Sequence, residues 1–453
     1  MAATCTQKSH STAPNPSITK DKAEQGILRT NPPSTYKLLP QLEPAAVLRH
    51  WKTTFSHLVH LGKLVAGSLP YAYIVPKDKD TSRYRPIISY VQAPHRQLLR
   101  TTARGLLFIL QQLDCKHFSL WSAYKAKDAV LSAHKQLSLS VFAQEYAHWR
   151  VQCLSVDIKE MYTELPHPVI RQAVTWATTR FHRQYRRDRV NVNRRGKAEG
   201  RAGRVYDNHL RREIILTDIV NVTELALQEA YFAAADLVLL QRNGIPMGCP
   251  TSPAFAIAVC IYSEHIFLDS MTNVPRPLVG VRYFDDLLLW TLVRTSPSGM
   301  SLPGEDVAAT NMLNLHKNIY HPSLRLIDQQ GGPRSFNFLE TIVSFGTQQG
   351  ITTTYLNKNR DTLLLQTPTQ KIQRFRHGAS AAPHGSLRSV VQSMFSRATV
   401  FETNPLQWVA TILLLSHEFC LLDYPVASIV QTLHRLSRRH HLGPAWSFIA
   451  SLL

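Results

Sequence analysis

Two adjacent carboxylates, Asp285 and Asp286, lie in the run Val281-Arg-Tyr-Phe-Asp-Asp-Leu-Leu-Leu-Trp290. Apolar residues on both sides of these acids predict two short strands that fold back through an acidic turn. Such a pair would not stabilise a packed hairpin, because burying an ionised carboxylate without a partner costs free energy. A divalent cation is a natural partner, since Mg²⁺ binds protein carboxylates together with water and substrate phosphates. The alternative is an ordinary solvated turn, in which paired aspartates are common.

A third acid ends another predicted strand. Val151-Gln-Cys-Leu-Ser-Val156 is typical of a buried strand and runs directly into Asp157. Upstream, Tyr71–Pro76 and Arg83–Tyr90 predict a basic hairpin around a charged turn. Between Asp157 and the acidic hairpin, Gly244-Ile-Pro-Met-Gly-Cys-Pro-Thr-Ser-Pro253 predicts a turn that leads into a helix.

Composition places the chain among globular proteins that attract polyanions. Its 453 residues are 44% hydrophobic and 18% charged, with a net charge of +20 and a pI of about 9.8. This balance favours a nucleic-acid partner, although a generic basic protein or a mitochondrial or ribosomal component has similar charge. No apolar run approaches the roughly 18 residues of a membrane span. The six cysteines show no CxxC pair and no zinc-type spacing.

Periodicity divides the chain into segments. Residues 1–40 are predicted to be a flexible leader or an organelle address, and residues 181–212 a mobile basic loop, because both are poor in apolar residues. The basic loop would contact nucleic-acid phosphates or be a solvated insertion. The apolar spacing predicts helices over 42–69, 98–113, 126–149, 214–240, 254–270 and 306–318, strands over 336–345 and 352–365, and mostly helix from 371 to the end.

The order of these motifs resembles the reverse transcriptase family, over roughly residues 69–345. The strings that carry the resemblance are Asp157-Ile-Lys-Glu-Met-Tyr162, Gly244-Ile-Pro-Met-Gly248, Tyr283-Phe-Asp-Asp286 and Phe336-Asn-Phe-Leu-Glu340. Within the family they look most like Penelope-like retroelement enzymes and telomerase-related reverse transcriptases. The resemblance implies an α+β right-hand polymerase, with fingers and an antiparallel palm sheet within residues 41–345 and a mostly helical thumb over 346–453. The fingers would cover about 69–150 and 175–255.

The resemblance also implies a two-metal site. Asp157 and Asp285 would be the shared carboxylate ligands, and the backbone carbonyl of Ile158 a further ligand. Asp286 would bind metal or hold the turn by local hydrogen bonding. Such sites use Mg²⁺, and Mn²⁺ suits the same ligands.

Nucleotide contacts are expected around this site. Lys77, Lys79, Arg83 and Arg85 of the basic hairpin would contact the triphosphate, unless the hairpin is simply solvated. The resemblance places Tyr162 beneath the sugar, where a ring would exclude a 2′-hydroxyl, and the alternative is a core tyrosine. Met247 and Gly248 would shape the floor of the pocket, or the turn would only begin a helix.

Two further roles are weaker expectations from position in the chain. Lys317 or His316 would protonate the leaving group, although Lys317 is also typical of a solvated helix residue. Phe336-Asn-Phe-Leu339 resembles a primer grip, and its alternation also fits any core strand.

These expectations describe an RNA-directed DNA polymerase that extends a primer. Its partners would be an RNA template, a DNA or RNA primer and dNTPs, without a membrane, in an intracellular, nuclear or organellar compartment. Two rivals remain open: an RNA-directed RNA polymerase or terminal transferase on the same palm, and an inactive nucleic-acid-binding derivative. The sequence does not determine the oligomeric state.

Overall fold

The computed structural model describes residues 35–77, 80–146, 148–194, 200–203, 210–234, 236–272, 274–329, 335–346, 350–365, 375, 377–380, 384–438 and 443–452. The chain divides into two compact units, one formed by Met1–Cys115 and Glu160–Tyr262 and the other by Lys116–Lys159 and Ser263–Leu453. We call them the first and the second unit. No helix in the described ranges combines the length and apolar character that crossing a membrane requires.

The first unit contains two sheets and a group of packed helices. Its five-stranded sheet has the order β1-β9-β8-β2-β3, and its three-stranded sheet the order β6-β5-β7. The strands are β1 (Tyr36–Leu38), β2 (Tyr71–Lys77), β3 (Asp80–Ser89), β5 (Arg189–Asn193), β6 (Gly200–Ala202), β7 (Arg211–Ile215), β8 (Tyr231–Ala234) and β9 (Leu237–Gln241). The helices are α2 (Pro44–Thr54), α3 (Arg96–Gln112), α6 (Met161–Glu164), α7 (His167–Tyr185) and α8 (Leu216–Gln228).

Several expectations for the first unit are wrong. The segment 181–212 is not simply a loop, because α7 continues to Tyr185 and the sheet β6-β5-β7 follows. The expected helix over 214–240 is α8 followed by the hairpin β8–β9, and the expected helix over 42–69 is shorter and ends at Thr54. Tyr36–Leu38, within the expected leader, pairs with β9 as strand β1. Residues 1–34 lie outside the described part.

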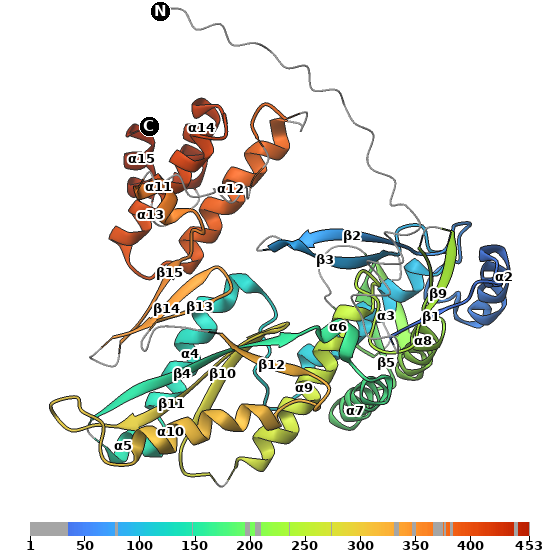
Figure 1. Ribbon diagram of the computed structural model, residues 1–453, viewed down its shortest axis with the longest axis horizontal. Helices are drawn as coiled ribbons and strands as arrows, with labels where there is room; N and C mark the ends of the chain where they lie inside the picture. Colours follow the sequence, from blue (N-terminus) through green and yellow to red (C-terminus); the bar gives the residue numbers. More distant parts are fainter. Residues whose placement is uncertain are drawn as a thin grey trace, which may run out of the picture. The chain divides into compact units, whose positions relative to one another are not determined.

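The second unit is built on a four-stranded antiparallel sheet with the order β10-β11-β4-β12. A second sheet, β13-β14-β15, and the C-terminal helices share one hydrophobic core with it. The strands are β4 (Trp149–Lys159), β10 (Leu278–Tyr283), β11 (Asp286–Arg294), β12 (Arg325–Gln329), β13 (Ser335–Phe338), β14 (Thr341–Phe345) and β15 (Ile351–Tyr355). The helices are α4 (Ala126–Ser138), α5 (Val141–Glu145), α10 (Glu305–Asn314), α11 (Arg360–Leu365), α12 (His384–Phe401), α13 (Pro405–Cys420), α14 (Val426–Ser437) and α15 (Gly443–Ser451), and α9 (Ser252–Ser270) begins in the first unit (Figure 1).

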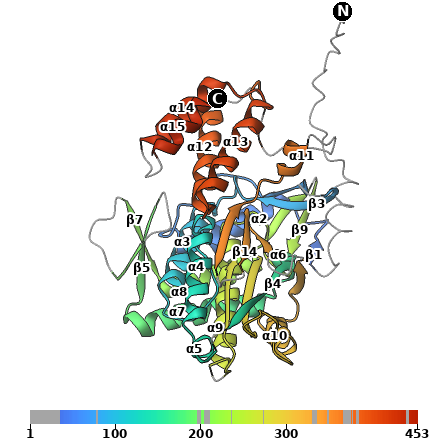
Figure 2. The same cartoon turned by 90° about the vertical axis from the view of Figure 1, so that its left-hand side faces the viewer.

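The four-stranded sheet is covered on both faces. Helix α4 lies on one side of it and helix α10 on the other (Figure 2). Strand β11 is therefore buried over almost its whole length, which explains its unbroken apolar run. The predicted antiparallel sheet and mostly helical C-terminal region are confirmed. The helix predicted over 126–149 ends before strand β4 begins, and the strand predicted over 352–365 ends at Tyr355.

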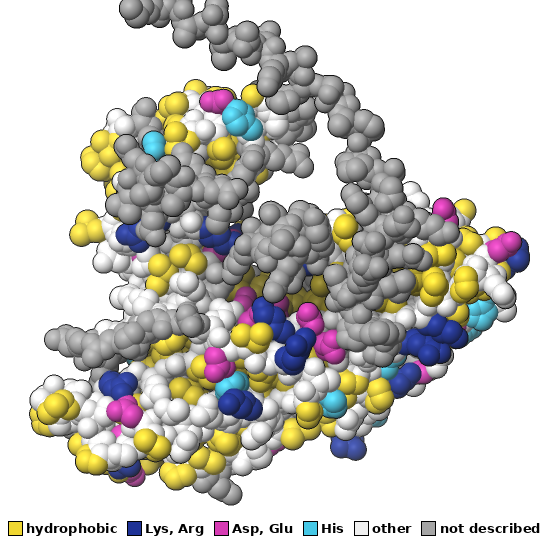
Figure 3. Space-filling model, viewed as in Figure 1, with side chains coloured by type: hydrophobic (Ala, Val, Ile, Leu, Met, Phe, Trp, Pro, Cys, Tyr) yellow, Lys and Arg dark blue, Asp and Glu magenta, His cyan; other side chains and the backbone are white. Residues whose placement is uncertain are grey.

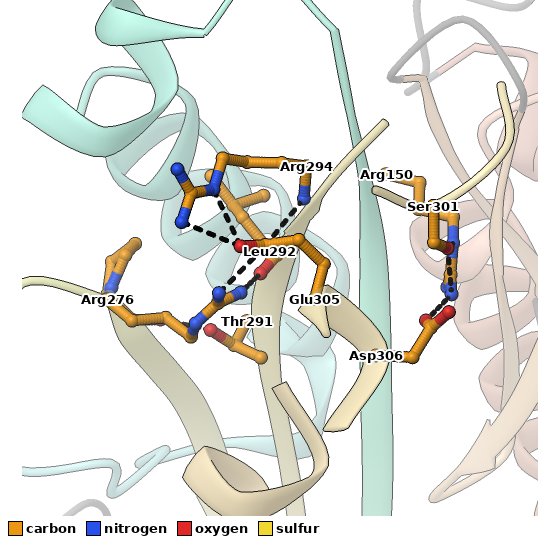
Figure 4. Close-up of polar contacts among 9 residues, drawn as sticks. Arg150, Arg276, Thr291, Leu292, Arg294, Ser301, Glu305 and Asp306 are labelled. Atoms are coloured by element: carbon orange, nitrogen blue, oxygen red, sulfur yellow. Dashed lines mark hydrogen bonds and ion pairs between the residues drawn. The ribbon is translucent and has the colours of Figure 1, made fainter. Parts of the chain in front are cut away.

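Buried and half-buried ion pairs fix the end of this sheet that lies away from the acidic turn. Glu305, at the start of α10, accepts hydrogen bonds from the guanidinium groups of Arg276 and Arg294 at 2.7 Å and from the backbone N–H of Arg294 at 3.1 Å (Figure 4). Burial alone would raise the pKa of Glu305, but these hydrogen bonds and positive charges lower the pKa below its usual value. A neighbouring pair joins Arg150 to Asp306. The loop that connects β11 to α10 is thereby tied to the strands.

Candidate functional site

Strand register brings the predicted carboxylates together. Asp286 is the direct cross-strand partner of Asp157, in the antiparallel pair formed by β11 and β4. Side chains of directly opposite residues lie on the same face, with Cβ atoms about 4.5–5.5 Å apart. Further along the strands, the same face carries Leu288 and Trp290, which are buried in the core. The acids therefore stand at the end of an otherwise apolar face.

The turn between β10 and β11 holds Asp285 beside this pair. Tyr283 and Asp286 close the hairpin, so Phe284 and Asp285 form a two-residue loop. The carbonyl oxygen of Asp285 accepts a hydrogen bond from the N–H of Ile158 at 2.9 Å. This bond joins the turn to the residue that follows Asp157. The structure thus places Asp157, Ile158, Asp285 and Asp286 at one end of the sheet.

Phe284 has an unusual backbone conformation. Its φ of 54° lies in the left-handed region, which a bulky residue occupies only where its surroundings impose it. In two-residue hairpin loops, a positive φ at the first loop position is usually supplied by glycine. The surroundings of this loop must therefore hold Phe284 in place.

A fully buried ion pair, which the motifs and periodicity of the sequence did not predict, supplies that support. Arg282 and Glu264 are both 0% exposed and form an ion pair, and a second guanidinium nitrogen of Arg282 donates to the carbonyl of Phe284 at 3.0 Å. Glu264 also accepts from the Tyr320 hydroxyl at 2.8 Å and from the Phe118 N–H at 3.0 Å. Buried charges need such partners. A single glutamate in the apolar helix α9 was the available sequence signal.

Asp157 also has a cationic neighbour. The Lys159 ammonium lies 2.8 Å from Oδ2 of Asp157, with side chains 45% and 19% exposed. Acidic side chains adjoin Lys or Arg side chains in several places on the face drawn in Figure 3. The Lys159 side chain is the exposed member of the pair, so its ammonium group contributes little stability there and a metal ion can replace it beside Asp157.

The donors present fit a hard divalent cation. Within the described ranges, no group of three or more His, Cys, Asp and Glu side chains could hold a metal ion. Mg²⁺ does not need such a cage, because it usually binds one or two carboxylates and completes its shell with water and phosphate oxygens. Asp157 and Asp286, with Asp285 adjacent, match that demand.

In the first unit, the turn at 244–248 packs against the short helix α6, which carries Tyr162. The N–H of Ile245 donates to the Tyr162 carbonyl at 2.6 Å, and the Met247 carbonyl accepts from the N–H of Ile88 at 2.7 Å. Gly248 has a φ of 118°, and a Cβ there would lie 2.4 Å from the Ile88 carbonyl oxygen. Gly248 is therefore required for close approach to strand β3. Tyr162, Met247 and Gly248 are brought to one region.

The basic hairpin is described only in part. Arg85 is exposed on β3, opposite Val75 of β2. Lys79 lies outside the described residues, as do the side chains of Lys77 and Arg83. A hollow of about 580 Å³ is lined by Gly248, Tyr73 and Ile87, together with arginines of α3.

The remaining predicted residues lie in the second unit. Lys317 is exposed on a short 3₁₀ helix (Leu315–Asn318). His316 is 1% exposed, with Nε2 at 3.3 Å from Asp328 and Nδ1 at 2.8 Å from the Leu313 carbonyl oxygen. The segment 336–339 forms part of β13 and the turn after it, where Leu339 has a φ of 59°. The roles of these residues stay predictions.

Comparisons with known proteins support the fold. No family model and no curated protein matches the chain. Among solved structures, telomerase from Candida albicans in complex with a TWJ fragment of telomeric RNA matches with a TM-score of 0.51 and 13% identity, covering 94% of this chain and 68% of that one. Apo telomerase from Candida tropicalis matches with a TM-score of 0.48 and 13% identity, covering 94% of this chain and 71% of that one. The BmCPV RNA-dependent RNA polymerase matches with a TM-score of 0.39 and 10% identity, covering 88% of this chain and 31% of that one. From the Candida albicans match, the chain has a reverse-transcriptase-like polymerase fold.

Proposed function

We propose that this protein is an RNA-directed DNA polymerase that extends a primer 3′-hydroxyl by two-metal nucleotidyl transfer. The observation that carries the proposal is the direct pairing of Asp157 with Asp286 across β4 and β11, with Asp285 in the adjoining turn. This arrangement brings carboxylates from two distant parts of the chain to one end of the sheet. The reverse-transcriptase-like fold supports the same assignment.

One or two of the carboxylates of Asp157, Asp285 and Asp286 would bind each Mg²⁺ or Mn²⁺ ion, since these ions prefer such oxygen ligands. When bound, the ions would lower the pKa of the primer hydroxyl and neutralise charge on the pyrophosphate. The chain itself contributes rigidity. Arg282 fixes the Phe284 carbonyl and so holds the loop residue Asp285 next to Ile158.

The nucleotide contacts are part of the proposal and rest on the sequence resemblance. Arg85 would bind phosphate oxygens, Tyr162 would select deoxyribose, and Met247 with Gly248 would support the base pair. Arg85 is exposed, as a phosphate ligand must be, and Gly248 lines a hollow large enough for a ligand. The closer likeness to Penelope-like and telomerase-related enzymes belongs to the same proposal.

Primer extension on a defined RNA template tests the function. The unmodified protein should incorporate dNTPs in the presence of Mg²⁺, and Asp157→Asn and Asp286→Asn should each lower the rate at least about 100-fold. Asp128→Asn is the matched control, because Asp128 is an exposed acid on α4 of the same unit. Synthesis that persists in Asp286→Asn would contradict the metal assignment. No synthesis by the unmodified protein on any template would favour the inactive nucleic-acid binder.

A further inference from the structure

We propose that an arginine-lined cleft in the first unit binds the phosphate backbone of single-stranded nucleic acid. The cleft has a volume of about 360 Å³ and is lined by five arginines: Arg96, Arg100, Arg104, Arg194 and Arg212. We call it the arginine cleft. Arg194 and Arg212 belong to the basic segment 181–212, whereas Arg96, Arg100 and Arg104 were not expected from the sequence to bind nucleic acid. The inference rests on the proposed function for the identity of its ligand.

The arginines come from two separate elements. Arg96, Arg100 and Arg104 are spaced four residues apart along α3, so they lie on one face of that helix. Arg194 directly follows β5, and Arg212 lies on β7, opposite Val192 of β5. The cleft is therefore built where the small sheet β6-β5-β7 meets α3. Like charges spaced in this way destabilise a helix, so folding alone does not favour them.

The described residues that line the arginine cleft are cationic or uncharged. Among the described residues that line the arginine cleft, none is an aspartate or a glutamate. Backbone carbonyls hold three of the guanidinium groups: Arg104 donates to Asn193 at 3.0 Å, Arg194 to Arg211 at 3.0 Å and Arg212 to His60 at 3.2 Å. These bonds orient the three side chains and bring no negative charge to the cleft.

Another arginine of the sheet β6-β5-β7 is paired with carboxylates, unlike the arginines described above. Arg189, at the other end of β5, lies 3.0 Å from Glu213 and 2.9 Å from Asp188.

The arginines of the cleft also repel one another electrostatically. Burial and the charge of Arg100 lower the pKa of Arg104, and burial and the charge of Arg194 lower the pKa of Arg212. An anionic ligand would relieve both effects.

The dimensions favour a strand of phosphates over a single anion. Four helical residues advance about 6 Å, so Arg96 and Arg104 are separated by about 12 Å along α3. A row of that length reaches more than one phosphate of a nucleic-acid strand, whereas a single small anion would contact only part of the row. The cleft is concave, which disfavours the flat surface of a membrane.

The neighbouring hollow argues for a single strand. Arg96, Arg100 and Arg104 also line the 580 Å³ hollow that contains Gly248 and the exposed ring of Tyr73. A cationic groove beside an exposed aromatic ring is the arrangement that single-strand binders use, with phosphates on arginine and a base stacked on the ring. In a duplex, bases are stacked on one another and do not reach Tyr73.

Fluorescence anisotropy with a labelled single-stranded RNA tests this inference without catalysis. The double variant Arg96→Gln/Arg100→Gln should weaken binding at least about tenfold. It should also reduce the magnitude of the salt slope, which is the slope of the logarithm of the binding constant against the logarithm of the salt concentration, by about 1.4, since each phosphate contact on a single strand contributes about 0.7. Arg96→Lys with Arg100→Lys keeps the charge and should keep the slope. Arg49→Gln with Lys52→Gln on the exposed face of α2 is the control with the same change of charge.

The outcomes separate this inference from the proposed function. A salt slope in the glutamine variant equal to that of the α2 control would overturn the inference, even if the protein synthesises DNA. An equal loss of affinity for duplex and single-stranded RNA would overturn the single-strand assignment. If the unmodified protein synthesises nothing but the cleft variants lose single-strand binding selectively, the proposed function fails and the arginine cleft stands. Unchanged thermal unfolding of each variant verifies that its fold is intact.

Discussion

Replacing Arg282 with methionine should destabilise the second unit by about 3–5 kcal/mol, the usual penalty for removing one partner of a buried ion pair. Arg282 and Glu264 are both 0% exposed, so the Glu264 carboxylate would stay buried without its cation. The Tyr320 hydroxyl and the Phe118 N–H would still donate to it, but neither carries a charge. The carbonyl of Phe284 would also lose its guanidinium donor.

A double variant separates stability from the geometry of the turn. Arg282→Met with Glu264→Gln removes both charges and keeps an amide oxygen that accepts from Tyr320. Replacing both members of a buried pair is often nearly neutral, so most of the lost stability should return. Primer extension should not return, because methionine cannot donate to the Phe284 carbonyl and the strained turn is left without support.

Calorimetric thermal unfolding and primer extension measure the two effects. A loss of 3–5 kcal/mol corresponds to roughly 6–20 °C for a unit of this size. Arg397→Met is the matched control, because its ion pair with Glu340 is 28% and 36% exposed and should contribute about 1 kcal/mol or less. The reasoning is wrong if Arg282→Met unfolds at the same temperature as the control variant. It is also wrong if the double variant extends primers at the unmodified rate.

Three further predictions concern single residues. Gly248→Ala should destabilise the first unit by about 1–3 kcal/mol, because the new Cβ would lie 2.4 Å from the Ile88 carbonyl oxygen at a φ of 118°; an unchanged melting temperature would refute this. Glu305→Gln should lower the melting temperature at neutral pH, and the difference should shrink as the pH falls from the usual glutamate value of 4.5 through the lower pKa of the folded state, because the carboxylate stabilises the fold only while ionised; a difference that does not change at all as the pH falls below 4.5 would contradict it. Tyr162→Ala should raise rNTP incorporation relative to dNTP incorporation in primer extension, and an unchanged ratio would remove the proposed sugar selection.

Local patterns predicted the elements that carry the carboxylates. The apolar runs on either side of Asp285 and Asp286 predict β10 and β11, and the run before Asp157 predicts β4, since each pattern lies within ten or so residues. The register that sets Asp157 opposite Asp286 could not be predicted in this way. It depends on which residues of two remote strands pair, and a shift of one residue would reverse the faces.

The missed strands had weaker local signals. Arg189-Val-Asn-Val-Asn193 does alternate, and Val190 and Val192 are almost fully buried, but the arginines on both sides dominated the composition. Strands β8 and β9 are short, and the alanines of Tyr231–Ala234 favour helix in isolation. Pairing with β1 and β2 overrides that preference. Such tertiary effects are not visible in a window of sequence.

The net charge of +20 combines two kinds of arginine that only the structure distinguishes. In the second unit, Arg282 and Arg276 each form a buried pair with a glutamate and stabilise the chain itself. The arginine cleft of the first unit has no carboxylate in its described lining, so its charge is directed to a ligand. Salt distinguishes the two kinds, because a buried pair is shielded from ions and a phosphate contact releases them on binding. Substitutions of the paired kind should therefore change thermal stability at every salt concentration, whereas substitutions in the cleft should change the salt dependence of nucleic-acid binding and leave stability intact.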